Sequence, residues 1–236
     1  ELIRRQLNIQ WQLPTGTRSE AIDPEVAGLL RDSGMTSMAY APESGSDRTR
    51  RLIKKKVQTP RLFESIDAAS GAGLNVAVFL VIGFPHDAPE DLAENLPFID
   101  ELGRRGVNDL SVGFFMALPG TEIFHSLYDA GRISFDRKYF LHILKSLALV
   151  PSQSYCDRLP PAALVRWKLR LLQRFYGARR KGTEGGLVTS LWRALRGLVG
   201  SENHSSKLQS AVRNAVTSGG ETIRVRFRPR YMKKSD

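Results

Sequence analysis

Four loops in the first two thirds of the sequence combine the glycine, proline, hydroxyl and charged residues that bind ligands at strand-to-helix turns. They read Pro14-Thr15-Gly16-Thr17-Arg18, Pro42-Glu43-Ser44-Gly45-Ser46, Gly83-Phe84-Pro85-His86-Asp87 and Leu118-Pro119-Gly120-Thr121-Glu122. Turn geometry alone explains one such loop, whereas four such loops at the same edge of a sheet favour a ligand site. Gly45 and Ser46 would present backbone amides to a carboxylate or a phosphate at a helix start.

Other catalytic arrangements are not indicated by the sequence. Its four histidines form no HExxH motif and no i,i+4 pair, so a histidine metal site is not expected. There is no G-x-S-x-G elbow and no phosphate-binding P-loop motif, which argues against a serine hydrolase and a P-loop enzyme. His86 is a candidate proton-transfer group, but a surface turn explains it better. The run Lys54-Lys55-Lys56 is expected to be a solvated helix end.

The elements that must position the four loops are short apolar runs that alternate with helical patterns. We expect strands over residues 7–13, 36–41, 74–82 and 109–117. Helices are expected to begin at Asp23-Pro24, Asp47, Thr59-Pro60 and a capping box of Asp87 with Glu90. This order predicts parallel strands with right-handed crossovers and a ligand site at their carboxyl ends. Both an open doubly wound sheet and part of a β/α barrel fit it.

The basic residues are concentrated in the last third of the chain. Residues 1–157 hold 17 basic and 20 acidic residues, whereas residues 158–236 hold 18 and 4. We therefore predict a boundary near Pro160-Pro161, with an amphipathic helix over residues 162–180. A second one, over residues 187–199, is suited either to packing on the barrel or to a membrane interface. The alternating arginines of residues 223–231 would suit a nucleic acid, which we rank below an anionic membrane surface.

Composition limits the remaining classes. Hydrophobic residues make up 42% and charged residues 25% of the 236, as in ordinary globular proteins. No run approaches 18 apolar residues, so the sequence predicts no transmembrane helix. The single cysteine, Cys156, excludes an internal disulfide and a multi-cysteine metal site, so we expect no metal ligands here. It also fits a reducing compartment, so we expect a cytoplasmic protein, with peripheral contact to the inner face of the membrane as a further expectation.

Taken in order, residues 42–47, 54–56, 79–85 and 119–121 resemble the later half of a radical SAM domain, in particular the branch with an upstream cobalamin-binding domain. In that family an ESGS segment follows the fourth barrel strand, GFP follows the fifth and PGT the sixth. The resemblance covers roughly residues 7–135. It implies an α/β fold, a partial β/α barrel over residues 1–157, followed by a basic, mainly helical extension over residues 158–236.

The resemblance also implies roles for individual residues. Glu43, Ser44 and Gly45 match the segment along the ribose and methionine part of S-adenosylmethionine. Ile82, Gly83 and Phe84 match the segment that backs the adenine. Arg18 would face the same pocket from the end of the third barrel strand. Pro119, Gly120 and Thr121 match a loop on the substrate side.

The sequence departs from the family at the cluster. Radical SAM enzymes hold a [4Fe-4S] cluster through three cysteines, usually C-x3-C-x2-C, and an electron from the cluster splits the sulfonium of the cofactor. This sequence has one cysteine, and it lacks the Gly-Gly-Glu-type segment expected after the second barrel strand. By count, it begins at the third barrel strand. Because the first residue is Glu1, we expect a truncated chain rather than a degenerate remnant.

Two functions are consistent with these observations. The first is the C-terminal fragment of a cobalamin-type radical SAM enzyme for methyl transfer or rearrangement on an unreactive carbon. Such a fragment would be inactive alone, and its partner would be the missing N-terminal part of the enzyme or a complementing chain. The alternative is a non-catalytic half-barrel module whose basic arm binds an anionic membrane or a nucleic acid.

Overall fold

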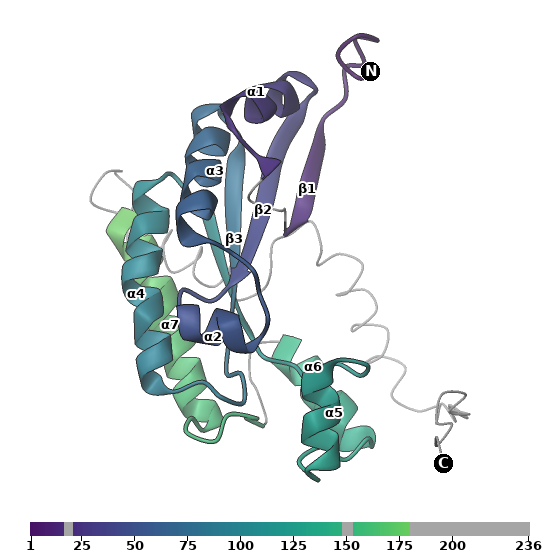
Figure 1. Ribbon diagram of the computed structural model, residues 1–236, viewed down its shortest axis with the longest axis vertical. Helices are drawn as coiled ribbons and strands as arrows, with labels where there is room; N and C mark the ends of the chain where they lie inside the picture. Colours follow the sequence, from purple (N-terminus) through teal and green to yellow (C-terminus); the bar gives the residue numbers. More distant parts are fainter. Residues whose placement is uncertain (17–20, 148–152, 180–236) are drawn as a thin grey trace, which may run out of the picture. The chain divides into compact units, whose positions relative to one another are not determined.

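The protein is built around one parallel β-sheet, seen in a computed structural model that describes residues 1–16, 21–147 and 153–179 (Figure 1). All described residues belong to one unit, Glu1–Val199. The sheet has four parallel strands in the order β1-β2-β3-β4. Their bounds are β1 (Trp11–Gly16), β2 (Met35–Glu43), β3 (Asn75–Ile82) and β4 (Asp109–Phe114).

Helices follow the strands as the sequence patterns predict. Asp23 caps the first of them by accepting a hydrogen bond from the Val26 N–H at 2.8 Å, and prolines stand in the first turns of the first, third and fourth. The described helices are α1 (Pro24–Asp32), α2 (Asp47–Leu52), α3 (Thr59–Gly71), α4 (Pro89–Arg104), α5 (Glu122–Asp129), α6 (Arg137–Leu147) and α7 (Pro161–Arg179).

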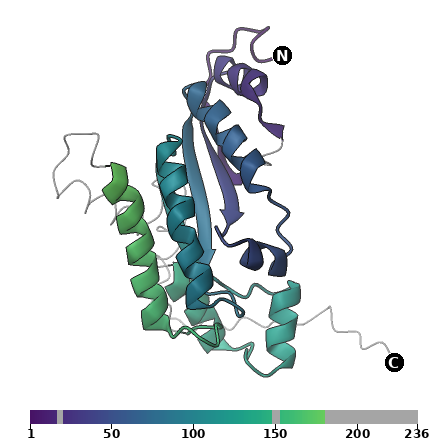
Figure 2. The same cartoon turned by 60° about the vertical axis from the view of Figure 1, so that its left-hand side comes forward.

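The strand order separates the two architectures that the sequence left open. Neighbouring strands in the sheet are also consecutive in the sequence, and α3, α4 and α7 lie on the same face (Figures 1 and 2). A doubly wound sheet reverses its order at a switch point and carries helices on both faces. The predicted α/β class and partial-barrel arrangement are therefore confirmed.

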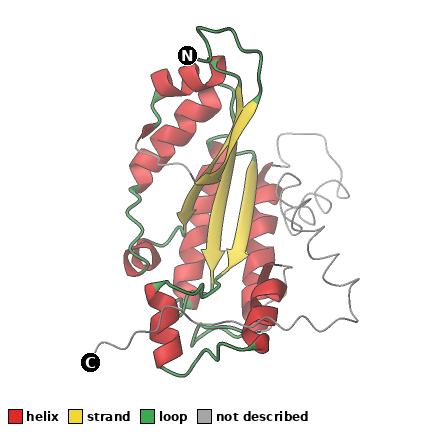
Figure 3. Cartoon of the chain, turned by 90° about the vertical axis from the view of Figure 1, so that its right-hand side faces the viewer, coloured by secondary structure: helices red, strands yellow, loops and turns green. Residues whose placement is uncertain are grey.

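The two faces of the sheet differ in burial. On β3, Val76, Val78, Leu80 and Ile82 are almost fully buried against the helices, whereas the alternate residues 77, 79 and 81 are half-buried. The same alternation holds on β4. Figure 3 shows the strands in front of the helices, with their arrowheads toward one end. The half-buried side chains line what would be the inside of a barrel, so ligands are expected at that end of the inner face.

The first part of the predicted basic region packs into the same core. Leu164, Leu171, Leu172 and Phe175 of α7 are buried with residues of α4 and the sheet. At the end of α7, the Tyr176 hydroxyl accepts a hydrogen bond from the Leu110 N–H of β4 at 3.3 Å. A smaller hydrophobic cluster forms around α5 and α6, including Phe124 and Tyr139. Of the described helices, none is long and apolar enough to cross a membrane.

Three predicted boundaries are wrong. The first strand begins at Trp11 rather than at residue 7, and the fourth ends at Phe114 rather than at residue 117. The N-cap of α4 is Ala88, and Asp91 takes the acidic third position of the box by accepting the Ala88 N–H at 2.9 Å. Asp87 is instead directed into the preceding turn. The segment 187–199 and the arginine-rich residues 223–231 lie outside the described residues.

Candidate functional site

The carboxyl ends of β2 and β3 bring two of the predicted loops side by side. Glu43, the last residue of β2, is paired in register with Leu80 of β3. Residues 43–49 and 82–91 therefore leave the sheet next to each other, and we call these two segments the rim. The rim contains the residues expected at the ribose, methionine and adenine parts of S-adenosylmethionine.

A buried carboxylate, that of Asp91 in the first turn of α4, joins the two segments of the rim. Its Oδ1 accepts a hydrogen bond from Ser46 Oγ at 3.3 Å, and its Oδ2 accepts one from Arg48 Nη1 at 2.6 Å. The side chain of Asp91 is only 4% exposed. A buried carboxylate is stable when it is paired and hydrogen-bonded, so Arg48 and Ser46 hold α2 against the start of α4.

A second buried carboxylate, that of Asp87, fixes the turn after β3. Its Oδ2 accepts hydrogen bonds from the backbone N–H groups of Gly83 at 2.9 Å and Phe84 at 3.0 Å. Its Oδ1 accepts one from Thr49 Oγ1 of α2 at 3.0 Å. Burial raises the pKa of Asp87 to about 6, against the lowering effect of these hydrogen bonds. Asp87 therefore closes its own turn and binds the opposite segment of the rim.

Gly45 is required by packing against α4. A Cβ at this position would lie 2.7 Å from Cβ of Phe98 and 3.1 Å from Cα of Asn95. Its backbone N–H donates to Asn95 Oδ1 at 2.7 Å, so this amide is not free for a ligand. The neighbouring Ser44 is also buried, and its Oγ accepts the Ser46 N–H at 3.1 Å. Both residues shape the loop that presents Glu43.

Glu43 is a partly exposed carboxylate at the end of β2. Its side chain is 26% exposed, and Oε1 accepts a hydrogen bond from Lys55 Nζ at 3.0 Å. Its φ of 68° lies in the left-handed region, which a side chain rarely adopts and which is common at functional sites. A half-exposed carboxylate on a fixed loop can accept hydrogen bonds from a diol such as a ribose.

The three residues expected at the adenine are all buried where β3 ends. Ile82 packs in the core between the sheet and the helices, whereas Phe84 packs on His86 and Phe115, with ring centroids 5.8 and 5.0 Å away. Gly83 has a φ of 88°, and a Cβ there would lie 2.8 Å from Leu164 Cδ1 of α7. Backbone conformation and packing thus explain the glycine.

The Pro119-Gly120-Thr121 loop lies after β4 and is exposed. Thr121 caps α5, because its Oγ1 accepts the Phe124 N–H at 3.2 Å. Lys54 of the α2–α3 loop and Glu122 of α5 form an ion pair at 2.5 Å, which links this loop to the rim. The lysine run lies just after the end of α2, as expected, and Lys54 is solvated; Lys54 and Lys55 also form ion pairs with carboxylates.

Two further predicted residues remain. Arg18 lies outside the described residues, so its role stays a prediction. His86 is half-buried, and burial lowers its pKa, so the ring is held in its neutral form in the turn. The predicted contacts with S-adenosylmethionine remain predictions.

Sequence reasoning missed the residues that hold the rim together. Thr49, Arg50, Asp87, Asp91 and Asn95 are all buried polar residues. The buried guanidinium of Arg50 donates to the Ser44 carbonyl at 2.7 Å. One signal was available in the sequence. Asp87, Asp91 and Asn95 are spaced four residues apart, which places their polar groups along one side of the start of α4.

The comparisons with known proteins are partial in length. No family model matches the sequence. Cytidylyl-2-hydroxyethylphosphonate methyltransferase from Streptomyces wedmorensis is 32% identical over 131 residues, which are 52% of this chain and 24% of that enzyme. An uncharacterized protein from Methanocaldococcus jannaschii is 29% identical over 82 residues, 34% of this chain and 18% of that protein. The chain thus spans about a quarter or less of these curated relatives.

Among solved structures, coproporphyrinogen III oxidase from Escherichia coli, a radical SAM enzyme, matches 58% of this chain and 31% of its own. The sequence identity is 20% and the TM-score 0.42.

Proposed function

We propose that this chain supplies the S-adenosylmethionine-binding rim of a radical SAM methyltransferase of the cobalamin type. The methyltransferase from Streptomyces wedmorensis supports the reaction class, since its similarity extends over about half of this chain. The order of the ESGS, GFP and PGT segments supports the cofactor. The reaction proposed is methyl transfer to an unreactive carbon.

The observation that carries the proposal is the placement of Glu43. It stands at the carboxyl end of β2, in a left-handed backbone conformation, with a partly exposed side chain. The surrounding loop is fixed by Asn95, Asp91 and Asp87, so the carboxylate needs little reordering to bind a ligand. In the proposed complex Glu43 accepts hydrogen bonds from the cofactor, while the backbone around Gly83 lies against its adenine.

The residues of this chain do not fit a [4Fe-4S] cluster. Such clusters need several thiolate ligands, and Cys156 is the only cysteine in the sequence. Its Sγ is buried and donates to the Asp87 carbonyl at 2.9 Å, and burial raises its pKa, which disfavours the thiolate. Among the described residues no group of three His, Cys, Asp or Glu could hold a metal. We derive no step through the cluster.

It follows from the proposal that the chain alone does not catalyse the reaction. Cluster ligands would be supplied by protein outside these 236 residues, in the same polypeptide or in a complementing chain. That partner would continue the sheet beyond the edge strand β1, which corresponds to the predicted third strand of the barrel.

The test is the binding of S-adenosylhomocysteine, a stable analogue of the cofactor, to the purified chain by isothermal titration calorimetry. Glu43→Gln removes the charge and keeps the shape, and we expect it to weaken binding at least about tenfold, as for a lost charge-assisted hydrogen bond. Glu122→Gln is the matched control, because the Glu122 carboxylate is also paired with a lysine, Lys54, but has no proposed contact with the cofactor. It should leave affinity within about twofold.

Equal affinities for both variants would refute the role of Glu43. A folded chain that binds no analogue, alone or with a complementing chain that carries the cysteine motif, would refute the proposed function. The non-catalytic half-barrel would then be the better description.

A further inference from the structure

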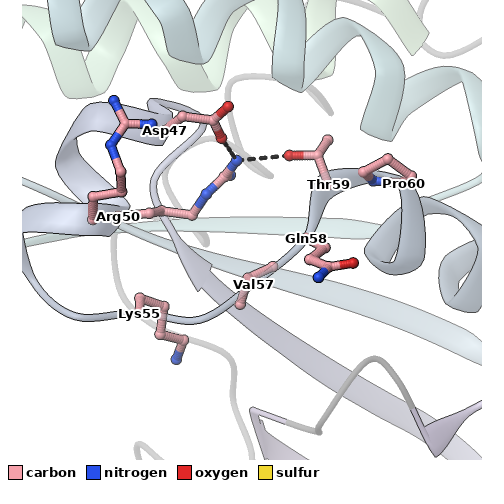
Figure 4. Close-up of a pocket in the computed structure, with 8 residues that line it drawn as sticks. Asp47, Arg50, Lys55, Val57, Gln58, Thr59 and Pro60 are labelled. Carbon is pink, nitrogen blue, oxygen red and sulfur yellow. Dashed lines mark hydrogen bonds and ion pairs between the residues drawn. The ribbon is translucent and has the colours of Figure 1, made fainter.

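A pocket of about 420 Å³ lies beside the rim, where the chain passes from α2 to α3. It is an open pocket lined by α2, the connecting segment and the first turn of α3 (Figure 4). Its lining residues are Asp47, Arg50, Arg51, Lys55, Val57, Gln58, Thr59 and Pro60. None of these residues was assigned a ligand by the motifs considered above.

The lining of the pocket is cationic. Three of its side chains are basic, and Asp47 is its one carboxylate. Arg50 already neutralises Asp47, and its Nη2 also donates to Thr59 Oγ1 at 2.6 Å, as Figure 4 shows. Arg51 is exposed and forms no ion pair within the part of the chain that the structure describes. A positive charge therefore remains at the pocket after the internal pairs are formed.

The pocket is also preorganised and joined to the rim. The buried Arg50 holds α2, the Ser44 carbonyl and Thr59 in one arrangement. Lys55 lies between the pocket and Glu43, with Nζ 3.0 Å from Glu43 Oε1. A group in the pocket could thus be bound by Lys55 without leaving Glu43 unpaired, because an ammonium has three donors. Gln58, the N-cap residue of α3, makes no side-chain capping hydrogen bond to the first turn.

We infer that this pocket binds the phosphate or phosphonate group of a small-molecule ligand, with Arg51 and Lys55 as its charged contacts. A guanidinium and an ammonium together suit a dianion with three acceptor oxygens better than a single carboxylate. The inference goes beyond the proposed function, because it concerns a neighbouring pocket and needs no S-adenosylmethionine. The same chemistry occurs in nucleic-acid backbones and lipid headgroups, which the test separates.

The test is an NMR titration of the full ¹⁵N-labelled chain with inorganic phosphate at constant ionic strength. Saturable shifts of the backbone amides of Arg51, Gln58 and Thr59 are expected. A site-resolved readout is needed because residues 158–236 carry 18 basic residues that attract any anion. Arg51→Gln should weaken the response at Gln58 and Thr59 at least about tenfold. Lys56→Gln, the same charge change in a residue that does not line the pocket, should weaken it less than about twofold.

Three outcomes would overturn the inference. The first is shifts that grow linearly without saturation, and the second is equal weakening by both variants, since each indicates only diffuse attraction. The third is a response of the pocket amides to phosphatidylserine vesicles or to a short single-stranded RNA but not to inorganic phosphate. Because no cofactor is present, failure here is distinct from failure of the cofactor-binding test.

Discussion

The backbone N–H of Gly45 donates a hydrogen bond to Asn95 Oδ1 at 2.7 Å, and the two residues are fifty positions apart in the sequence. Asn95 is buried, and its Nδ2 in turn donates to the Asp91 carbonyl at 3.1 Å and the Leu92 carbonyl at 3.3 Å. One amide side chain therefore fastens the loop after β2 to the helix after β3. The position of the loop that ends β2 depends on α4.

Asn95→Ala should lower the free energy of unfolding by about 1–3 kcal/mol, because it leaves the partly buried Gly45 N–H without its acceptor. Urea unfolding measures the loss. Asn75→Ala is the control, since Asn75 is exposed and donates once, to the Thr36 carbonyl at 3.3 Å. It should change the free energy by less than about 0.5 kcal/mol. Equal losses in the two variants would contradict the role of Asn95.

Gly45→Ala should cost about 1–3 kcal/mol of unfolding free energy, because the new Cβ would lie 2.7 Å from Cβ of Phe98. Gly28→Ala makes the same chemical change within α1, where a Cβ has nothing within 4 Å. That variant should gain about 0.5–1 kcal/mol, as alanine is favoured in helices. Thermal and urea unfolding compare the pair. A neutral Gly45→Ala would show that α4 can withdraw from the loop.

Stability should depend on pH through Asp87. Burial raises its pKa to about 6 in the folded protein, whereas an unfolded aspartate titrates near 3.9. Between these values the folded state binds more protons, so the free energy of unfolding should decrease as pH rises from about 4 to about 6 and then remain level. The decrease is at most ~3 kcal/mol.

Asp87→Asn should remove this dependence, because its amide oxygen still accepts the Gly83 and Phe84 N–H groups but does not ionise. The difference in unfolding free energy between wild type and variant, measured at pH 4.5 and at pH 7.5, isolates Asp87 from other groups. Asp129→Asn, an exposed carboxylate at the end of α5, is the control. A wild-type-minus-variant difference that is the same at both pH values would show that Asp87 does not titrate there.

Lys168 of α7 should destabilise the fold at neutral pH. Burial lowers its pKa to about 8, and Nζ lies 4.9 Å from the centroid of the Phe114 ring. The unfolded chain binds more protons at this position between pH 8 and about 10.4, so stability should rise with pH over that range. Lys168→Met should raise the unfolding free energy at pH 7 and flatten the rise. Lys138→Met, on the exposed side of α6, should do neither.

The sequence predicted elements best where local chemistry determines them. Asp23 with Pro24 marks the start of α1, where Asp23 is the cap, and Pro60 marks the start of α3, because capping and proline geometry act within one turn. The buried alternate residues of β3 made that strand evident from its apolar run. These signals need no knowledge of the tertiary structure.

The rest depends on contacts between distant segments. Gly16 has poor strand propensity, yet it is the last residue of β1. A Cβ there would lie 2.7 Å from Cβ of Ala41 on the neighbouring strand, so the close approach of the two strands explains the glycine. Ala88 carries no capping signal, so the start of α4 was placed on Asp87. That carboxylate is instead bound by Thr49, which is 38 positions away. No local pattern distinguishes these two uses of an aspartate before a helix.

The position of Cys156 makes opening of the rim measurable. Its thiol is buried beneath the turn after β3, with Sγ donating to the Asp87 carbonyl, so an alkylating reagent reaches it only when that turn moves away. In native buffer the alkylation rate therefore reports the opening equilibrium of this segment. A molecule that binds only the closed rim slows alkylation. The rate falls by a factor of 1 + L/Kd, where L is the concentration of the free molecule and Kd its dissociation constant. Since Cys156 is the only thiol in the chain, unlabelled compounds can be screened for occupancy by mass spectrometry, without an assay for turnover.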